Sequence, residues 1–401
     1  MKSTISSLNP ADFLKMTSTR NSKIEAASNE MPKKLLDYDT NILAAELHPE
    51  VQYLKISKVT ERDGKDVKSF EFVPDTSKGT NKLAYFNAGQ YLSMVVKIGD
   101  ITISRPYSIS SSPEDALNGK YELTIKRVDG GLATNYILDN WKEGDEVASS
   151  GPLGTFSYEP IRDAKTVIGI AGGSGITPFK SMANAIIQGD EDFNLVLLYG
   201  SRDSKNILFK KEFDEIMKKT DKVKVIHVLS NEEKEGYEHG FITKELIEKY
   251  APKGEYSIFL CGPQAMYTFV DKEIEKLNLR QKFIRHEVFG EYRNPEKDAK
   301  YPKDLKETTF KLKVTIRDEV KEITVNANDT LLNSMEKNGI FAPADCRSGL
   351  CGWCRSKLVS GNVYIPESVD HRRLADSDFG YIHPCATFPL SDCELIVPPV
   401  H

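Results

Sequence analysis

Four cysteines near the C-terminal end constrain this 401-residue chain most strongly, because they are spaced like the ligands of one metal centre. Cys346, Cys351, Cys354 and Cys385 follow the pattern Cys-x4-Cys-x2-Cys-x30-Cys. Four thiolates at this spacing hold a [2Fe-2S] cluster, with three ligands on one loop and the fourth from elsewhere in the chain. Glycines between the first three cysteines allow the backbone to fold tightly and to direct N–H groups at the sulfurs. The sequence therefore predicts one-electron chemistry.

Zinc binding is the rival interpretation of the same cysteines. Structural zinc usually takes paired Cys-x2-4-Cys elements, and no second close pair accompanies Cys385. His383 lies two residues before Cys385, but a Rieske centre needs two histidines in place of two cysteines. Cys393 lies in a strand-like context and is expected to belong to the core. The iron-sulfur cluster is favoured, with zinc and unligated core cysteines as the alternatives.

The composition limits the partners and the location of the chain. Its formal net charge is -5, without a long Lys/Arg block, which argues against nucleic acid as a partner. The longest apolar stretches, around Thr166–Ala171 and Leu195–Tyr199, are far shorter than the roughly 20 residues that span a bilayer. Residues 1–10 lack the apolar core of a signal peptide, and thiolate-bound iron fits a reducing compartment. We therefore expect a cytoplasmic protein with no membrane span.

The chain is expected to be multidomain, with a β domain followed by an α/β domain. Short alternating runs separated by Gly, Asp and Asn turns predict an antiparallel β-barrel over residues 51–160. These runs are Lys68–Val73, Tyr91–Ile98, Tyr121–Arg127 and Glu146–Ser149. Over residues 161–290, apolar strands alternate with amphipathic helical stretches, as in βαβ units around a parallel sheet. The strands are Thr166–Ala171, Asn194–Gly200, Lys222–Leu229 and Tyr256–Cys261, and the helices begin near Thr177, Phe209, Thr243 and Pro263.

The remaining segments complete the predicted organisation. Residues 291–309 are rich in Lys, Asp, Glu and Pro and are predicted to form a solvated linker. Residues 310–401 are predicted to form the cluster-binding domain. Residues 1–50 are an N-terminal extension with a weak helical pattern around Leu35–Leu47.

Two motifs of the α/β part indicate a nucleotide site. The turn that contains Gly172, Gly173 and Gly175 follows an apolar strand and opens a helix at Thr177. Glycines let the backbone approach a pyrophosphate, and a helix N-terminus offers N–H groups with a partial positive charge. Cys261 ends a later strand, at the edge where open α/β sheets bind their ligands. A tight turn and a buried core cysteine are the alternatives, but the position of both motifs favours a shared crevice.

Two motifs of the barrel suit a flavin. Arg105, Tyr107 and Ser108 offer a cation for phosphate, a flat ring and a hydroxyl within four residues. Downstream, the segment Lys126–Asn135 offers glycine backbone and a threonine hydroxyl to a second phosphate. Each segment alone is also compatible with an ordinary edge strand and turn.

In this order, the motifs resemble the ferredoxin-NADP reductase superfamily, in an arrangement with a C-terminal plant-type ferredoxin domain as in reductases of oxygenases. The resemblance covers roughly residues 50–401. It implies an antiparallel flavin-binding barrel, a Rossmann-like NAD(P)-binding domain and a β-grasp-like [2Fe-2S] domain.

The resemblance also implies roles for individual residues. Catalytic roles fall on Ser108, near flavin N5, and on Cys261, close to the nicotinamide ring. Flavin contacts fall on Arg105, Tyr107, Ser108, Gly130, Gly131, Thr134 and Phe289. Nucleotide contacts fall on Gly172, Gly173, Gly175 and Thr177. The implied cofactors are FAD, with FMN as the alternative, the cluster, and NADPH or NADH.

The implied chemistry is electron transfer. A nicotinamide gives two electrons as hydride, a cluster accepts one, and a flavin does both. Arg202 and Lys205, Lys210 and Lys211 after the second strand favour NADPH, because cations near the ribose hold a 2'-phosphate. The expected partner is an electron-acceptor protein, such as an oxygenase, an iron-sulfur enzyme or a small carrier. Electron flow in reverse, and a non-catalytic redox sensor or subunit, are the rival functions.

Overall fold

The computed structural model describes residues 10–26, 38–63, 66–288, 290–305 and 308–400. The chain divides into two compact units, residues 1–47 and 48–401. The first contains α1 (Pro10–Ala26) and α2 (Asp39–Leu47). Helix α2 confirms the helical pattern expected near Leu35–Leu47, of which residues 35–37 lie outside the described residues. Helix α1 was not predicted, because its apolar residues follow no clear helical period.

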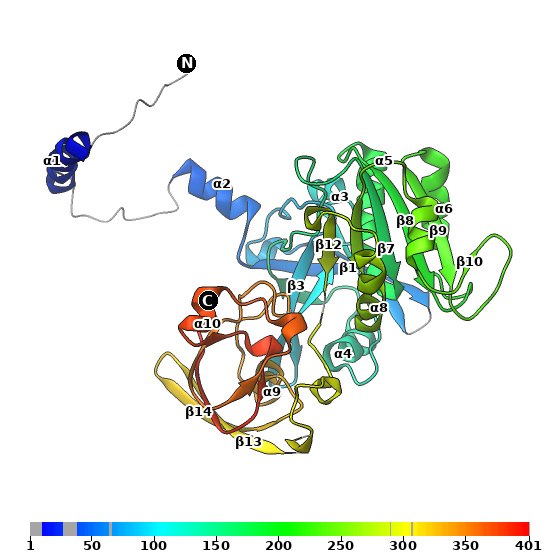
Figure 1. Cartoon of the computed structure of the whole chain (residues 1–401). Coiled ribbons are helices and arrows are strands. Elements are labelled where there is room, and N and C mark those ends of the chain that lie inside the picture. Colours follow the sequence, from blue (N-terminus) through cyan, green and yellow to red (C-terminus); the bar gives the residue numbers. More distant parts are fainter. Residues whose placement is uncertain (1–9, 27–37, 64–65, 289, 306–307, 401) are drawn as a thin grey trace. The chain divides into compact units, whose positions relative to one another are not determined.

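The second unit begins with the antiparallel barrel that the alternating runs predict (Figure 1, blue to green-cyan). Phe70 and Phe72 point into its core while Glu71 between them is partly exposed, which is the alternation of a half-buried strand. A bridge between Ile109 and Leu123 joins the two ends of the strand order β4-β3-β6-β1-β2-β5. The elements are β1 (Gln52–Asp63), β2 (Val67–Pro74), β3 (Tyr91–Ile98), β4 (Ile101–Ser108), α3 (Pro113–Leu117), β5 (Tyr121–Lys126), α4 (Leu132–Asn140) and β6 (Glu146–Ser149).

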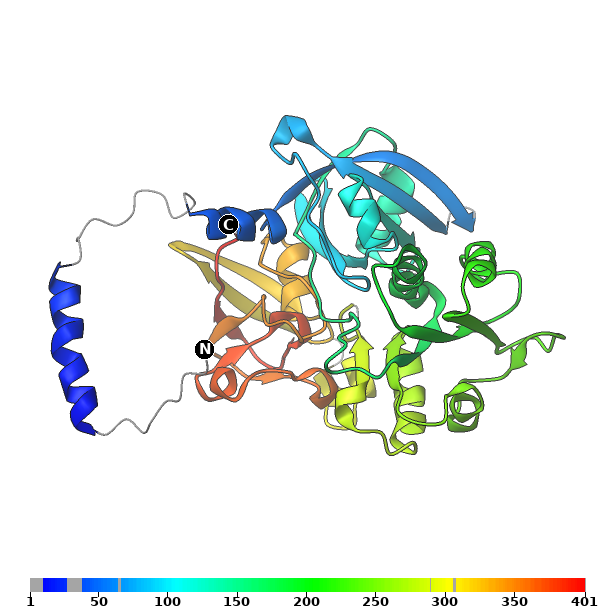
Figure 2. The ribbon, with the colours of Figure 1, turned by 90° about the horizontal axis from the view of Figure 1, so that it is seen from above.

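The next domain is a parallel sheet covered by helices on both faces, in the strand order β10-β9-β8-β7-β11-β12. Successive residues of β7 enter different cores: Val167 packs with α5 and α6, whereas Ile168 packs with α7 and α8. The predicted βαβ pattern is therefore confirmed (Figure 2, green to yellow-green). The elements are β7 (Thr166–Gly172), α5 (Thr177–Gln188), β8 (Asn194–Ser201), α6 (Lys210–Lys219), β9 (Val223–Leu229), β10 (Glu238–His239), α7 (Lys244–Tyr250), β11 (Ser257–Cys261), α8 (Gln264–Glu275) and β12 (Ile284–Glu287).

The C-terminal domain is a mixed sheet in the order β14-β13-β19-β15-β17, with a separate pair of β16 and β18. Its core contains Leu331 and Met335 of α9, together with Cys393, which is 5% exposed and lies in the core as expected. The elements are β13 (Thr309–Ile316), β14 (Glu319–Asn326), α9 (Leu331–Lys337), β15 (Ser356–Ser360), β16 (Val363–Tyr364), α10 (Leu374–Asp378), β17 (Tyr381–Ile382), β18 (Phe388–Pro389) and β19 (Cys393–Ile396).

The segment between the last two domains is more closely packed than its composition predicts. Tyr301 is 2% exposed, and its hydroxyl donates to the carbonyl oxygen of Ala327 at 3.0 Å. Pro295 is also buried. The expectation of a solvated linker is therefore wrong for these residues, because their apolar side chains are buried. The predicted domain boundaries themselves stay predictions.

In the part of the chain that the structure describes, no helix has the length and apolar character needed to cross a membrane.

Candidate redox cleft and cluster loop

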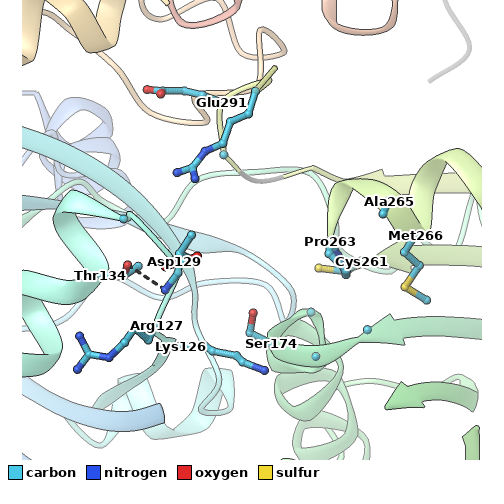
Figure 3. A pocket seen from close by; sticks show the side chains of 18 of the residues that line it. Lys126, Arg127, Asp129, Thr134, Ser174, Cys261, Pro263, Ala265, Met266 and Glu291 are labelled. Carbon is cyan, nitrogen blue, oxygen red and sulfur yellow. Dashed lines mark hydrogen bonds between the residues drawn. The ribbon is translucent and has the colours of Figure 1, made fainter. Parts of the chain in front are cut away.

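One large cleft collects the predicted binding residues. It has a volume of about 1510 Å³ and is lined by the barrel, the α/β domain and the C-terminal domain. Figure 3 shows Lys126, Arg127 and Thr134 from the barrel on one side of it and Cys261 and Met266 from the α/β domain on the other. The predicted residues that line it are Arg105, Tyr107, Ser108, Gly130, Gly131, Thr134, Gly172, Gly173, Gly175, Thr177, Arg202 and Cys261. Phe289, the remaining one, lies outside the described residues.

Strand β4 supplies an aromatic and a cationic wall of the cleft. The hydroxyl oxygen of Tyr107 is buried and has no hydrogen-bond partner among the described residues. Burial raises the pKa of the Tyr107 phenol, so the hydroxyl stays a donor at neutral pH. An orphaned buried donor beside the buried Ser108 fits a polar heterocycle such as a flavin.

Arg105 forms an ion pair with a residue of the C-terminal domain. Its Nη1 donates to the carbonyl oxygen of Ser104 at 2.7 Å and to Oε2 of Glu336 at 3.1 Å. Glu336 lies on α9 of the C-terminal domain. The predicted phosphate partner is therefore shared between the cleft and a neighbouring domain, which the sequence alone did not indicate.

The turn before α4 is shaped for an anion. Gly131 is the N-cap of α4, and in the described residues no side chain caps this end. A Cβ on Gly131 would lie 2.5 Å from Oγ1 of Thr134, so the close approach requires glycine. The dashed line in Figure 3 marks the hydrogen bond from the Val128 amide to Thr134 Oγ1, 3.3 Å long. First-turn N–H groups without a side-chain cap fit a phosphate.

A second uncapped helix start faces the same cleft from the α/β domain. The 3-10 turn Gly173–Ile176 leads from β7 directly into α5, and no side chain among the described residues caps either element. A Cβ on Gly175 would lie 2.2 Å from the carbonyl oxygen of Cys261. Glycine therefore permits the turn to lie against the end of β11, where a dinucleotide phosphate fits the free N–H groups.

Cys261 ends β11 at the carboxyl edge of the sheet. It is 2% exposed and is paired in register with Ala171 of β7 and Glu287 of β12. Burial, reinforced by the neighbouring Glu287 carboxylate, raises the pKa of the thiol well above its ordinary value. The side chain is therefore a neutral thiol at physiological pH and suits packing against a nicotinamide ring better than nucleophilic chemistry.

The basic residues after β8 are only partly brought to the cleft. Arg202 lines it and is exposed, together with Asn206. Lys210 instead lies 2.8 Å from Asp214 on the same helix, and neither Lys205 nor Lys211 lines the cleft. Arg202 is thus the one predicted cation that the described structure offers to a 2'-phosphate.

The cluster loop directs backbone N–H groups at the cysteine sulfurs. The amides of Ser348 and Cys351 donate to Sγ of Cys346 at 3.5 and 3.3 Å, and the amide of Gly349 donates to Sγ of Cys385 at 3.3 Å. Gly349 and Gly352 have φ of +79° and +72°, in the left-handed region that favours glycine. Donors of this kind stabilise thiolates that bind iron.

Two of the four predicted ligand sulfurs lie next to each other. Sγ of Cys354 lies 3.4 Å from Sγ of Cys385. Among the described residues, no group of three or more His, Cys, Asp or Glu side chains is placed to hold a metal ion. His383 uses Nδ1 to donate to the carbonyl oxygen of Gly349 at 2.7 Å, so this ring supports the loop backbone. The donor set fits a two-iron cluster.

Several cleft residues were missed because they come from distant parts of the chain. Phe241, Arg293 and Asn333 line the cleft, and none belongs to a recognisable local motif. Asn333 lies on α9, so the C-terminal domain contributes to the cleft wall. No signal in the sequence pointed to that contribution, since it depends on the packing of whole domains.

The sequence matches three protein families in the order of its three domains. Residues 55–158 match the family described as oxidoreductase FAD-binding domain, and residues 170–272 match oxidoreductase NAD-binding domain. Residues 314–390 match 2Fe-2S iron-sulfur cluster binding domain.

Two curated relatives match most of the chain, and a third matches about half of it. The glycine betaine monooxygenase reductase subunit of Pseudomonas aeruginosa is 29% identical over 343 residues, which is 82% of this chain and 90% of the relative. The ferredoxin reductase component of 3-ketosteroid-9-alpha-monooxygenase from Rhodococcus rhodochrous is 29% identical, covering 84% of this chain and 94% of the relative. NADH-cytochrome b5 reductase 1 of Dictyostelium discoideum is 33% identical, covering 49% of this chain and 68% of the relative.

A solved structure matches the whole domain arrangement. Phthalate dioxygenase reductase, described as a modular structure for electron transfer from pyridine nucleotides to [2Fe-2S], superposes with a TM-score of 0.63 at 25% identity. The match covers 87% of this chain and 98% of that structure. The order of the three domains is therefore the same over nearly the full length of the second unit.

Proposed function

This chain belongs to the ferredoxin-NADP reductase superfamily, in the arrangement with a C-terminal plant-type [2Fe-2S] domain, and we propose that it supplies single electrons from NAD(P)H to a separate acceptor protein. The observation that carries this proposal is that one cleft is lined by the barrel motif, the nucleotide turn and the C-terminal domain together. A bound flavin takes hydride and returns single electrons to a cluster. The side chains and backbone of the cleft position these groups and provide charges and hydrogen-bond donors for their phosphates.

The barrel side of the cleft binds the flavin. Arg105 and the turn at Gly131 hold the phosphate groups of FAD, while Tyr107 and Ser108 face its ring system. Support comes from the orphaned hydroxyl of Tyr107 and from the uncapped start of α4. FAD is favoured over FMN, because the barrel matches the FAD-binding family.

The nicotinamide nucleotide occupies the other side of the cleft. The turn Gly172–Gly175 and Thr177 receive its phosphates, and Cys261 lies against the nicotinamide. The close approach of Gly175 to the backbone of Cys261, which leaves no room for a Cβ, supports this role. It places the phosphate-binding turn next to the end of β11. Arg202 selects the 2'-phosphate of NADPH over NADH.

Electrons leave through the exposed side of the cluster loop. Cys346, Cys354 and Cys385 are buried, whereas Cys351 is exposed. Its neighbours Leu350 and Trp353 are 51% and 58% exposed, so two large apolar side chains lie next to the accessible ligand in the sequence. Exposed apolar side chains beside an accessible ligand suit a contact with an acceptor protein. The partner is an oxygenase component by analogy with the relatives named above, and the location is the cytoplasm, where thiolate-bound iron is stable.

Anaerobic reductive titration of the purified protein tests the proposal. Adding NADH, and separately NADPH, in steps should remove both the flavin absorbance and the cluster absorbance, with about two electrons for the flavin and about one for the cluster. Zinc in place of iron, or an inert cluster, would overturn it. A protein that binds nucleotide without reduction would instead support the redox-sensor alternative. Reduction by a reduced carrier protein, with NAD(P)H as product, would support reverse flow.

A further inference from the structure

A buried network of charges connects the cluster loop to the flavin strand. Arg347 directly follows the ligand Cys346 and forms two parallel hydrogen bonds to Glu336 of α9, each 2.8 Å long. Arg347 and Glu336 are both 1% exposed. Glu336 also receives the 3.1 Å hydrogen bond of Arg105 from the flavin strand β4. Glu291, which follows the α/β domain, forms a further ion pair with Arg347.

The same loop is fixed to β4 on both sides of Cys346. The hydroxyl of Ser104 donates to the carbonyl oxygen of Ala344 at 2.6 Å, two residues before the ligand. Nη1 of Arg347 donates to the carbonyl oxygen of Ser104 at 3.2 Å, one residue after it. Ser104 immediately precedes Arg105 and lies three residues before Tyr107. One position of β4 therefore sets the location of a cluster ligand relative to the flavin-facing side chains.

The energetics of burial explain why this contact is well defined. Two buried charges lose their hydration, and only close geometry with further hydrogen bonds compensates for that loss. A planar guanidinium opposite a carboxylate allows one relative orientation, so the pair fixes distance and angle together. An apolar contact of the same area tolerates sliding, because the hydrophobic effect is not directional. The pair therefore fixes the cluster loop against α9, and the bonds from Arg105 to Glu336 and from Arg347 to Ser104 then favour one docked arrangement of the C-terminal domain on β4.

Arg347 also belongs to the wall of the cleft. Its buried Nε has no hydrogen-bond partner among the described residues. Nearby, Asn333 and Lys337 of α9 line the same cleft. The side of the C-terminal domain that carries the ion pair thus faces the space that fits a flavin.

We propose that Glu336 and Arg347 are positioning residues that hold the cluster loop against the flavin strand and so set the rate of electron transfer between flavin and cluster. In this step one electron leaves the reduced flavin and converts one ferric ion of the oxidised cluster to ferrous, and no bond forms between the two groups. The second electron follows after the acceptor protein has reoxidised the cluster. The inference rests on the proposed function, which supplies the nicotinamide nucleotide as reductant.

Two variants test the proposal in the full-length protein loaded with flavin and cluster. Glu336→Gln removes the charge and keeps the volume, and Arg347→Lys keeps the charge but loses the two-pronged geometry. Anaerobic stopped-flow absorbance with NADH or NADPH measures flavin reduction and cluster reduction in the same mixing experiment. We expect the ratio of the cluster rate to the flavin rate to fall severalfold in both variants, because electron transfer between two separated groups slows steeply as the distance between them grows.

Amide hydrogen exchange provides a readout that does not depend on turnover. Exchange over residues 344–351 and 104–107 should become faster in both variants, because their shared contacts are weakened. Glu322→Gln is the matched control in the same domain. Glu322 is 62% exposed and lies 3.7 Å from Lys311, so this variant should change neither the rate ratio nor the exchange.

Equal rate ratios and equal exchange in wild type, Glu336→Gln and Arg347→Lys would overturn the proposal. If a variant loses flavin or cluster on purification, Glu336→Asp decides, since it keeps the carboxylate charge and shortens its reach to Arg347 and Arg105. An unchanged rate ratio and unchanged exchange in Glu336→Asp would then overturn the proposal, and a lower ratio would support it. Failure of the proposed function is distinguishable, because it appears in the wild-type protein as the absence of flavin reduction.

Discussion

The substitution Gly175→Ala tests the nucleotide turn with a defined steric perturbation. The added Cβ would lie 2.2 Å from the carbonyl oxygen of Cys261 and 2.8 Å from the amide nitrogen of Gly262. Both neighbours are backbone atoms, so no side-chain rotation relieves the overlap. Ordinary contact begins at 3.4 Å, and the turn and the strand end must therefore separate by about 1 Å.

The two consequences of this displacement differ in size. Overpacking of this kind costs about 1 to 3 kcal/mol, which is less than the roughly 5 to 15 kcal/mol that stabilises a folded domain. The protein therefore remains folded at 25 °C. A shift of about 1 Å between reacting groups lowers a rate by up to about a hundredfold. We expect the rate of flavin reduction to fall far more than the stability.

Stopped-flow flavin reduction over a range of nucleotide concentrations measures the loss, and thermal unfolding measures the stability. Gly189→Ala is the control at the other end of α5. Gly189 has φ of +90°, and no atom of the described residues lies within 4 Å of the added Cβ. The variant therefore loses about 1 to 2 kcal/mol through backbone strain alone and keeps its flavin reduction rate. Normal nucleotide saturation and a normal rate in Gly175→Ala would refute the placement of the nucleotide.

Three further predictions concern single residues. Cys351→Ser should lose the cluster absorbance while flavin reduction by NAD(P)H persists; concurrent loss of flavin would contradict the modular arrangement. Arg202→Ala should raise the KM for NADPH about tenfold through loss of a charged phosphate contact and leave the KM for NADH unchanged; equal changes for both nucleotides would exclude a role in selection. Burial, aided by Glu159 and Asp190, raises the pKa of Glu191 to about 7, so the stability linked to its protonated form is present at low pH and is lost as pH rises from about 4.5 to 7. Glu191→Gln should therefore stabilise the protein by about 1 to 2 kcal/mol at pH 8 and by much less at pH 4.5, as measured by chemical denaturation; an equal effect at both pH values would contradict the assignment.

Local patterns predicted most of the fold. Alternation along Tyr91–Ile98 and the apolar run at Thr166–Ala171 both correspond to strands, because burial on one face or on both leaves a direct mark on the sequence. The cluster loop could be predicted equally well, because three of its four ligands are close in sequence. Its glycines adopt positive φ angles, which other residues rarely adopt.

Contacts between domains could not be predicted from local sequence patterns. Glu336 and Arg347 are ordinary charged residues in the sequence, and their burial arises only when α9 packs against β4. Arg105 was predicted as a phosphate partner from its own motif, but its bond to Glu336 depends on a residue 231 positions away. Tyr301 was assigned to a solvated linker because its neighbours are charged, and its burial follows from the neighbouring domain. Tertiary packing overrides composition in each case.

The central claim is that electrons pass from NAD(P)H through the flavin to the cluster within one chain. Anaerobic stopped-flow mixing with NADH, and separately with NADPH, tests it most directly when flavin and cluster absorbance are followed together. The account predicts that flavin absorbance bleaches first and that cluster absorbance falls afterwards at a rate independent of nucleotide concentration. Absence of reduction by either nucleotide, or cluster reduction that precedes flavin reduction, would contradict it.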